Sequence, residues 1–166
     1  MSTTQQNFTI KREYKAPKEL VFNAFASSEA LAQWWGPKGM PITVIKLDFK
    51  SNGVFHYKME GGGQVMWGVF NYGNINPHDL IEFTNSFSDE QGNVARAPFS
   101  PIWPLEVKNT ITLTENNGIT TLVISGHPIN STDTENQMFY SFFASMEQGF
   151  KGTFDQLEEY LTKTQS

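Results

Sequence analysis

The stretch from Thr132 to Leu161 constrains the fold most, because its apolar residues recur at steps of three and four. That spacing puts one continuous apolar stripe on an α-helix of roughly 45 Å. The stripe consists of Phe139, Phe142, Phe143, Met146, Phe150, Phe154, Leu157 and Leu161. Thr132, followed by Glu135, predicts a capping box at the start of this helix. A helix of this length requires a large apolar surface, which the preceding chain must supply.

The preceding segments alternate with a period of two, which is typical of β-strands. Strands are predicted at residues 8–14, 42–49, 54–59, 65–72, 80–87, 107–114 and 119–125. The sequences Asn52-Gly53 and Asn117-Gly118 predict tight hairpin turns, because both residue types tolerate a positive φ. Two short helices are expected after the first strand, one through Leu20 to Phe25 and one through Leu31 to Trp35.

Short turns make consecutive strands neighbours in space. A sheet of about seven antiparallel strands twists and curls, and only the last helix is long enough to cover its concave face. The sequence therefore predicts an α+β fold, in which a curved antiparallel sheet surrounds a long C-terminal helix. We expect a single domain over residues 7–162, preceded by a disordered tail at residues 1–6.

Charge and composition exclude several classes of function. The net charge is −5 and no long run of like charges is present, so nucleic acid is not an expected partner. The sequence has no cysteine, which excludes disulfides and Cys–zinc sites. No apolar segment is long enough to span a membrane, and the first residues do not resemble a signal peptide. We therefore expect a cytoplasmic protein without membrane insertion.

Two aromatic segments are candidates for the mouth of a cavity. The string from Trp34 to Gly39 contains Trp34 and Trp35, which can form an aromatic wall or simply fill the core at a helix end. The segment from Ser88 to Pro104 is too long for a turn and is rich in proline. Its Phe99, Ile102 and Trp103 are expected to fold back over something apolar. A cavity-mouth role is favoured, and the alternative is a cluster that plugs a sheet edge.

Strand parity predicts which side chains face the helix. Phe55, Tyr57 and Met59 alternate with His56 and share the inward face. Met66 and Trp67 are adjacent and must point to opposite faces, but the pattern does not show which is inside. Gly149 and Gly152 interrupt the long helix. They are interpreted as packing features that allow a close approach to the sheet or a mild kink.

No catalytic or metal site is predicted. The three histidines, His56, His78 and His127, are far apart and have no metal-ligand spacing. No GxSxG nucleophile motif is present. An enzyme would require an inward pair of acid and base groups. His56 and Tyr57 are the nearest candidates, and parity puts them on opposite faces.

Four strings, in this order, resemble the heat-shock protein 90 ATPase activator-like proteins of the START-like (SRPBCC) superfamily. They are Gln33 to Gly39, Gly68 to Phe70, Pro98 to Pro104 and Met146 to Leu157, and the resemblance runs from about Phe8 to Leu161. Phe150 stands where tryptophan is commoner in the family. The resemblance implies the helix-grip fold and an apolar cavity between helix and sheet, without implying one activity. The eponymous co-chaperones carry a further N-terminal domain, which is not expected here, so a chaperone partner is not expected either.

The leading hypothesis is non-enzymatic binding of a small apolar or amphipathic ligand in that cavity, with no cofactor. The alternatives are an enzyme of the polyketide cyclase or hydrolase type and a co-chaperone-like module that binds proteins. A homodimer is left open. The candidate ligand-binding residues are Trp34, Trp35, Phe55, Tyr57, Met66, Trp67, Phe87, Phe99, Trp103, Phe142, Met146 and Phe150.

Overall fold

A computed structural model describes residues 7–36 and 39–165. The expected tail at residues 1–6 and part of the Trp34–Gly39 string therefore lie outside the described residues. The elements follow in the order β1 (Phe8–Tyr14), α1 (Lys18–Asn23), α2 (Ser28–Trp34), β2 (Ile42–Leu47), β3 (Val54–Gly61), β4 (Gln64–Asn76), β5 (Leu80–Ser88), β6 (Val94–Ala95), β7 (Glu106–Asn116), β8 (Ile119–Ile129), α3 (Asp133–Ser141) and α4 (Phe143–Thr164).

The strands form one antiparallel sheet in the order β1-β8-β7-β5-β4-β3-β2, and the two-residue β6 pairs with β5. The consecutive strands β2, β3, β4 and β5 lie side by side in the sheet, as the short turns between them predict. Both hairpin turns are present, with a positive φ at Asn52 (66°) and Asn117 (55°). A Cβ at Gly53 would lie only 2.0 Å from the Asp48 carbonyl oxygen, which explains the glycine there.

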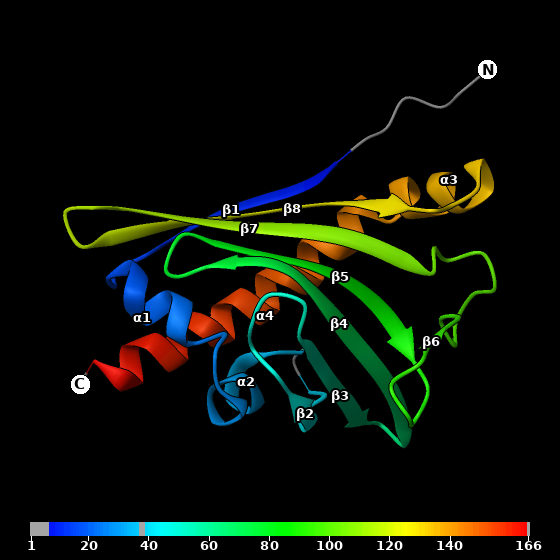
Figure 1. The fold of residues 1–166 in the computed structure, drawn as a ribbon, viewed down its shortest axis with the longest axis horizontal. Helices are drawn as coiled ribbons and strands as arrows, with labels where there is room; N and C mark the ends of the chain where they lie inside the picture. Colours follow the sequence, from blue (N-terminus) through cyan, green and yellow to red (C-terminus); the bar gives the residue numbers. More distant parts are fainter. Residues whose placement is uncertain (1–6, 37–38, 166) are drawn as a thin grey trace.

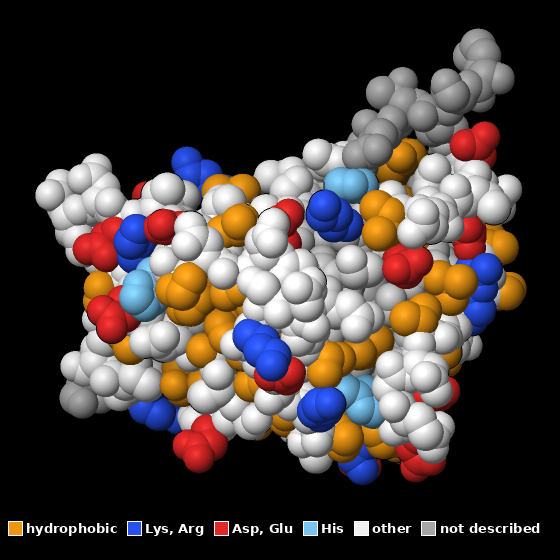
Figure 2. Space-filling model, viewed as in Figure 1, with side chains coloured by type: hydrophobic (Ala, Val, Ile, Leu, Met, Phe, Trp, Pro, Cys, Tyr) orange, Lys and Arg blue, Asp and Glu red, His pale blue; other side chains and the backbone are white. Residues whose placement is uncertain are grey.

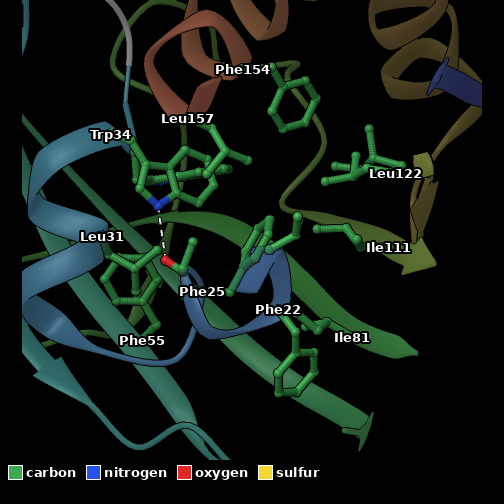
Figure 3. Close-up of a cluster of buried hydrophobic side chains, with 14 of the residues drawn as sticks. Phe22, Phe25, Leu31, Trp34, Phe55, Ile81, Ile111, Leu122, Phe154 and Leu157 are labelled. Carbon is green, nitrogen blue, oxygen red and sulfur yellow. Dashed lines mark hydrogen bonds between the residues drawn. The ribbon is translucent and has the colours of Figure 1, made fainter. Parts of the chain in front are cut away.

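Helix α4 runs diagonally across the sheet, and α1 and α2 lie beside its C-terminal part (Figure 1). The predicted α+β helix-grip arrangement is confirmed. The core lies between these helices and the concave face of the sheet, where Trp34, Phe55, Phe154 and Leu157 are fully buried (Figure 3). The indole N–H of Trp34 donates to the Ala24 carbonyl oxygen at 2.9 Å and so ties α2 to the end of α1.

The C-terminal helix is divided at Phe142, which corrects the prediction of one continuous helix. Phe142 has φ −101° and ψ 8°, and its N–H bonds to the Phe139 carbonyl oxygen, three residues back. At this tighter turn Phe139 and Phe142 both contact Trp103, and Phe139 also packs against Phe143. The predicted capping box of Thr132 and Glu135 is present at the start of α3.

The glycines of α4 do not serve a close approach to the sheet, so that part of their interpretation is wrong, and the mild kink stays a prediction. A Cβ added at Gly149 or Gly152 would meet no atom within 4 Å.

On the face drawn in Figure 2, Lys and Arg side chains lie among Asp and Glu side chains and between apolar ones. Within the described residues, no helix is both long and apolar enough to cross a membrane.

Candidate ligand-binding cavity

A cavity of about 310 Å³ lies between the concave face of the sheet and the first half of α4. This volume is at the lower end of the range found for small-molecule sites. The lining is mostly apolar and comes from five strands, α3, α4 and two loops: Phe8, Trp35, Gly36, Tyr57, Met59, Gly68, Asn85, Ser86, Phe87, Trp103, Pro104, Val107, Asn109, Phe139, Met146, Gly149, Phe150 and Thr153.

The end of α2 forms one wall of the cavity. The ring of Trp35 lies edge-on to that of Phe70, with ring centroids 5.2 Å apart, and its centroid is 6.4 Å from that of Phe150. The preceding Trp34 is 0% exposed and belongs to the core, so the two interpretations of this string each apply to one tryptophan. The Gly36 carbonyl oxygen accepts hydrogen bonds from Thr153 and Gln156, both at 3.0 Å. These bonds hold the wall against α4.

The segment between β5 and β7 forms the opposite wall. Trp103 lines the cavity and packs against Phe139 and Phe142, with ring centroids 5.6 and 5.4 Å away. Phe99 and Ile102 remain 53% and 42% exposed, so the expectation that all three side chains fold back is wrong for these two. Phe99 nevertheless packs against Phe87, Trp103 and Phe142, with ring centroids 5.6, 5.6 and 6.4 Å away.

Tyr57 contributes a hydroxyl to the apolar lining. It lies directly opposite Gly68 on the neighbouring strand, and a Cβ on that glycine would be 2.6 Å from Tyr57 Cζ and Oη. The ring therefore occupies the space that a side chain at position 68 would take. Burial raises the pKa of Tyr57 to about 12, although a hydrogen bond with the Trp35 side chain partly offsets this effect. The hydroxyl is protonated at neutral pH.

Two asparagines in the lining were missed by the sequence analysis. Asn85 lies between Phe83 and Phe87 on the inward face of β5, and Asn109 lies between Val107 and Ile111 on the inward face of β7. The available signal was parity: each asparagine occupies an inward position in an otherwise apolar row. Asn109 is only 6% exposed and lies across from Gly126, where a Cβ would be 2.3 Å from its Oδ1.

The candidate residues divide between the cavity and its surroundings. The cavity is lined by Trp35, Tyr57, Phe87, Trp103, Met146 and Phe150. The core or the rim contains Trp34, Phe55, Met66, Phe99 and Phe142. Met66 lies opposite Met59 and so faces inward, which places its neighbour Trp67 on the outer face of the sheet. Trp67 is therefore not positioned to line the cavity.

The outer face holds a separate small cluster around His56. The imidazole of His56 stacks on Trp67 with ring centroids 5.6 Å apart, and its Nε2 lies 3.2 Å from the Asp89 carbonyl oxygen. His56 is thus a satisfied histidine on the face opposite Tyr57, as parity predicts. Ser86 borders the cavity, but its side chain belongs to this outer row with Val69, and its buried hydroxyl has no hydrogen-bond partner among the described residues. In the described part of the chain, no three His, Asp or Glu side chains are grouped as metal ligands.

Comparisons with known proteins agree with this fold. The family model of the "Activator of Hsp90 ATPase homolog 1-like protein" matches residues 15–162, so the family resemblance is confirmed. The crystal structure of protein Ms6760 from Mycobacterium smegmatis is similar at 25% identity and a TM-score of 0.76, over 95% of this chain and 92% of that one. A solution structure from Arthrobacter aurescens gives 26% identity and a TM-score of 0.78, over 95% and 86% of the two chains. The Nitrosomonas europaea protein NE0264 has the same fold at 18% identity, over 99% of both chains with a TM-score of 0.76. No curated protein matches the sequence.

Proposed function

We propose that this chain, which belongs to the family of activator of Hsp90 ATPase homolog 1-like proteins, is a non-enzymatic binding module for a small apolar or amphipathic molecule. The observation that carries the proposal is the cavity of about 310 Å³ beneath α4. No charged side chain is present among its described lining residues. A ligand gains about 2.5 kcal/mol for each 100 Å² of apolar surface that such a site removes from water.

The enzyme hypothesis has less support from the geometry. Acid–base catalysis requires a donor or acceptor within hydrogen-bond reach of the substrate. His56 and Tyr57 lie on opposite faces of the sheet, and His56 is engaged with the backbone of Asp89. The Tyr57 hydroxyl has a raised pKa because of burial, which makes it a poor proton donor at neutral pH. These observations support binding rather than catalysis as the proposed function.

Native mass spectrometry of the freshly purified protein tests this proposal. We expect a mass above that of the chain, which decreases when the bound molecule is extracted with organic solvent. The same spectrum reports whether the chain is a monomer or a homodimer. The extracted protein should then bind N-phenyl-1-naphthylamine, an uncharged apolar fluorescent probe, saturably and with one site per chain. Absence of a co-purified molecule together with absence of saturable probe binding would overturn the proposal.

A further inference from the structure

Two carboxamide side chains lie in the cavity wall on adjacent strands. Asn85 on β5 is opposite Val107, and Asn109 on β7 is opposite Phe83, so the two asparagines are diagonal neighbours on one face. Diagonal neighbours in an antiparallel pair are about 7–8 Å apart. That separation leaves room for one polar atom or group to contact both carboxamides. Both asparagines line the cavity.

Neither asparagine is needed to complete the sheet. Asn109 donates from Nδ2 to the Val107 carbonyl oxygen at 3.3 Å, two residues away on its own strand. The Asn85 side chain is half-buried and makes no hydrogen bond to another group within residues 7–36 and 39–165. A polar group held in apolar surroundings without full hydrogen bonding destabilises the fold. Apolar side chains occupy the flanking inward positions, so a leucine or valine at position 85 would suit the core better.

The shape of the sheet makes room for the buried carboxamide. Gly126 lies opposite Asn109, and any side chain there would collide with Asn109 Oδ1. Tyr57 and Gly68 form the same kind of pair on β3 and β4. The Tyr57 hydroxyl stays neutral below a pKa of about 12. The described lining therefore offers donors and acceptors but no charge that would balance an ionised ligand.

We propose that Asn85 and Asn109 bind the polar group of an uncharged amphipathic ligand, one that carries an amide, ketone or hydroxyl beside its apolar part. The inference rests on the proposed binding function and narrows its ligand class. A carboxamide can donate to a carbonyl oxygen and accept from an N–H or O–H group, so a pair of them suits such a ligand. An ionised carboxylate or phosphate would enter an apolar cavity without a compensating cation.

A competition experiment on the unmodified protein tests the ligand class. Decanamide and decanoate have the same chain length and differ in the charge of the head group, so each is titrated against bound N-phenyl-1-naphthylamine. We expect decanamide to displace the probe at least tenfold more effectively at neutral pH. Equal displacement, or a preference for decanoate, would overturn the inference while leaving the binding function intact. Failure of the probe itself to bind would instead overturn the binding function.

Substitution of the asparagines tests the residues. Asn85→Leu and Asn109→Leu keep the side-chain size and remove the hydrogen bonds, so we expect each to weaken decanamide binding about three- to tenfold. Probe binding should stay within twofold, because the probe relies on apolar contact. Asn71→Leu is the matched control, since Asn71 is exposed on the outer face of β4. Equal decanamide affinity in all three variants would overturn the assignment of these residues. Thermal unfolding checks that each variant is folded, and the selectivity of the unmodified protein does not depend on any variant.

Discussion

Arg96 and Glu135 form an ion pair that connects the segment between β5 and β7 to the first turn of α3. Arg96 also donates to the Trp103 carbonyl oxygen at 3.1 Å. The Glu135 carboxylate in turn accepts from the Thr132 N–H at 2.8 Å, as part of the capping box. One buried carboxylate therefore holds both the helix start and the wall that carries Trp103.

Removal of the cation should destabilise the fold more than removal of an ordinary surface charge. Arg96→Ala leaves the carboxylate of Glu135, a residue that is only 7% exposed, with only its helix-cap bonds. We expect the free energy of unfolding in urea to fall by about 1–2 kcal/mol. Lys50→Ala is the control, because Lys50 and Asp48 form an exposed pair at 3.6 Å that should contribute at most about 0.5 kcal/mol. Similar losses in the two variants would show that the Arg96 ion pair has no special role.

The same carboxylate should make stability depend on pH. The hydrogen bond from Arg96 and those from Thr132 lower the pKa of Glu135 below its ordinary 4.5. A group whose pKa is lower in the folded state stabilises the fold above its unfolded pKa. That contribution is lost as the pH falls from 4.5 through the folded value. Glu135→Gln should therefore lose less unfolding free energy than the unmodified protein when the pH is lowered from neutral to below this range. Parallel stability curves for the two proteins would contradict this prediction.

The fit of Tyr57 over Gly68 predicts a strong effect of one methyl group. Gly68→Ala places a Cβ 2.6 Å from a ring that is buried and cannot swing into solvent. We expect the free energy of unfolding to fall by about 1–3 kcal/mol, as in other overpacked cores. Gly73→Ala on the same strand is the matched control, because its Cβ would make an ordinary contact with Glu82 at 3.5 Å. If both alanines have the same effect, the ring is not confined as the structure indicates.

Filling the cavity from the helix should abolish binding without loss of stability. Gly149 lines the cavity, and a Cβ added there would meet no atom within 4 Å. Gly149→Leu should weaken binding of N-phenyl-1-naphthylamine at least tenfold, while the helix gains up to about 1 kcal/mol from loss of the glycine. Gly152→Leu should stabilise the helix to the same extent. Gly152 does not line the cavity, so the affinity of this variant for the probe should stay within twofold of that of the unmodified protein. Equal binding by the two variants would place the probe elsewhere.

Binding of an uncharged probe should not depend on pH near neutrality. The ionisable group in the described lining is Tyr57, whose pKa of about 12 results from burial. We expect the dissociation constant of N-phenyl-1-naphthylamine to stay within twofold between about pH 6 and about pH 9. A titration step in this interval would reveal an ionisable group that takes part in binding.

Periodicity predicted most of the architecture because burial on one face leaves a clear pattern. The inward row of Phe55, Tyr57 and Met59 and the core end of the helix at Phe154 and Leu157 follow directly from spacing. The break at Phe142 could not be found in this way, because the apolar spacing continues unchanged through it. At the break Phe142 contacts Trp103, which lies in a loop far away in the sequence, and only the tertiary structure reveals this neighbour.

The cavity itself was only partly predictable for a similar reason. A large aromatic side chain looks the same in a sequence whether it fills the core, as Phe55 does, or borders a void, as Phe87 does. Asn85 and Asn109 are neutral amides, so they carry neither the charge nor the aromatic ring that marks a candidate site residue in a sequence. Their inward parity was visible in the alternation, but the register that makes them diagonal neighbours comes from the tertiary structure.

The glycines at positions 68 and 126 determine more than local backbone geometry. Each lets a larger polar side chain from the next strand lie flat across it, so the inner contour of the sheet is set by residue pairs. A relative with alanine at position 68 must have a smaller or differently placed partner at position 57. The ligand preferences of such proteins should therefore be compared through the paired positions 57 with 68 and 109 with 126. A comparison of single positions would miss these paired changes and would suggest that the cavity has the same shape in all relatives.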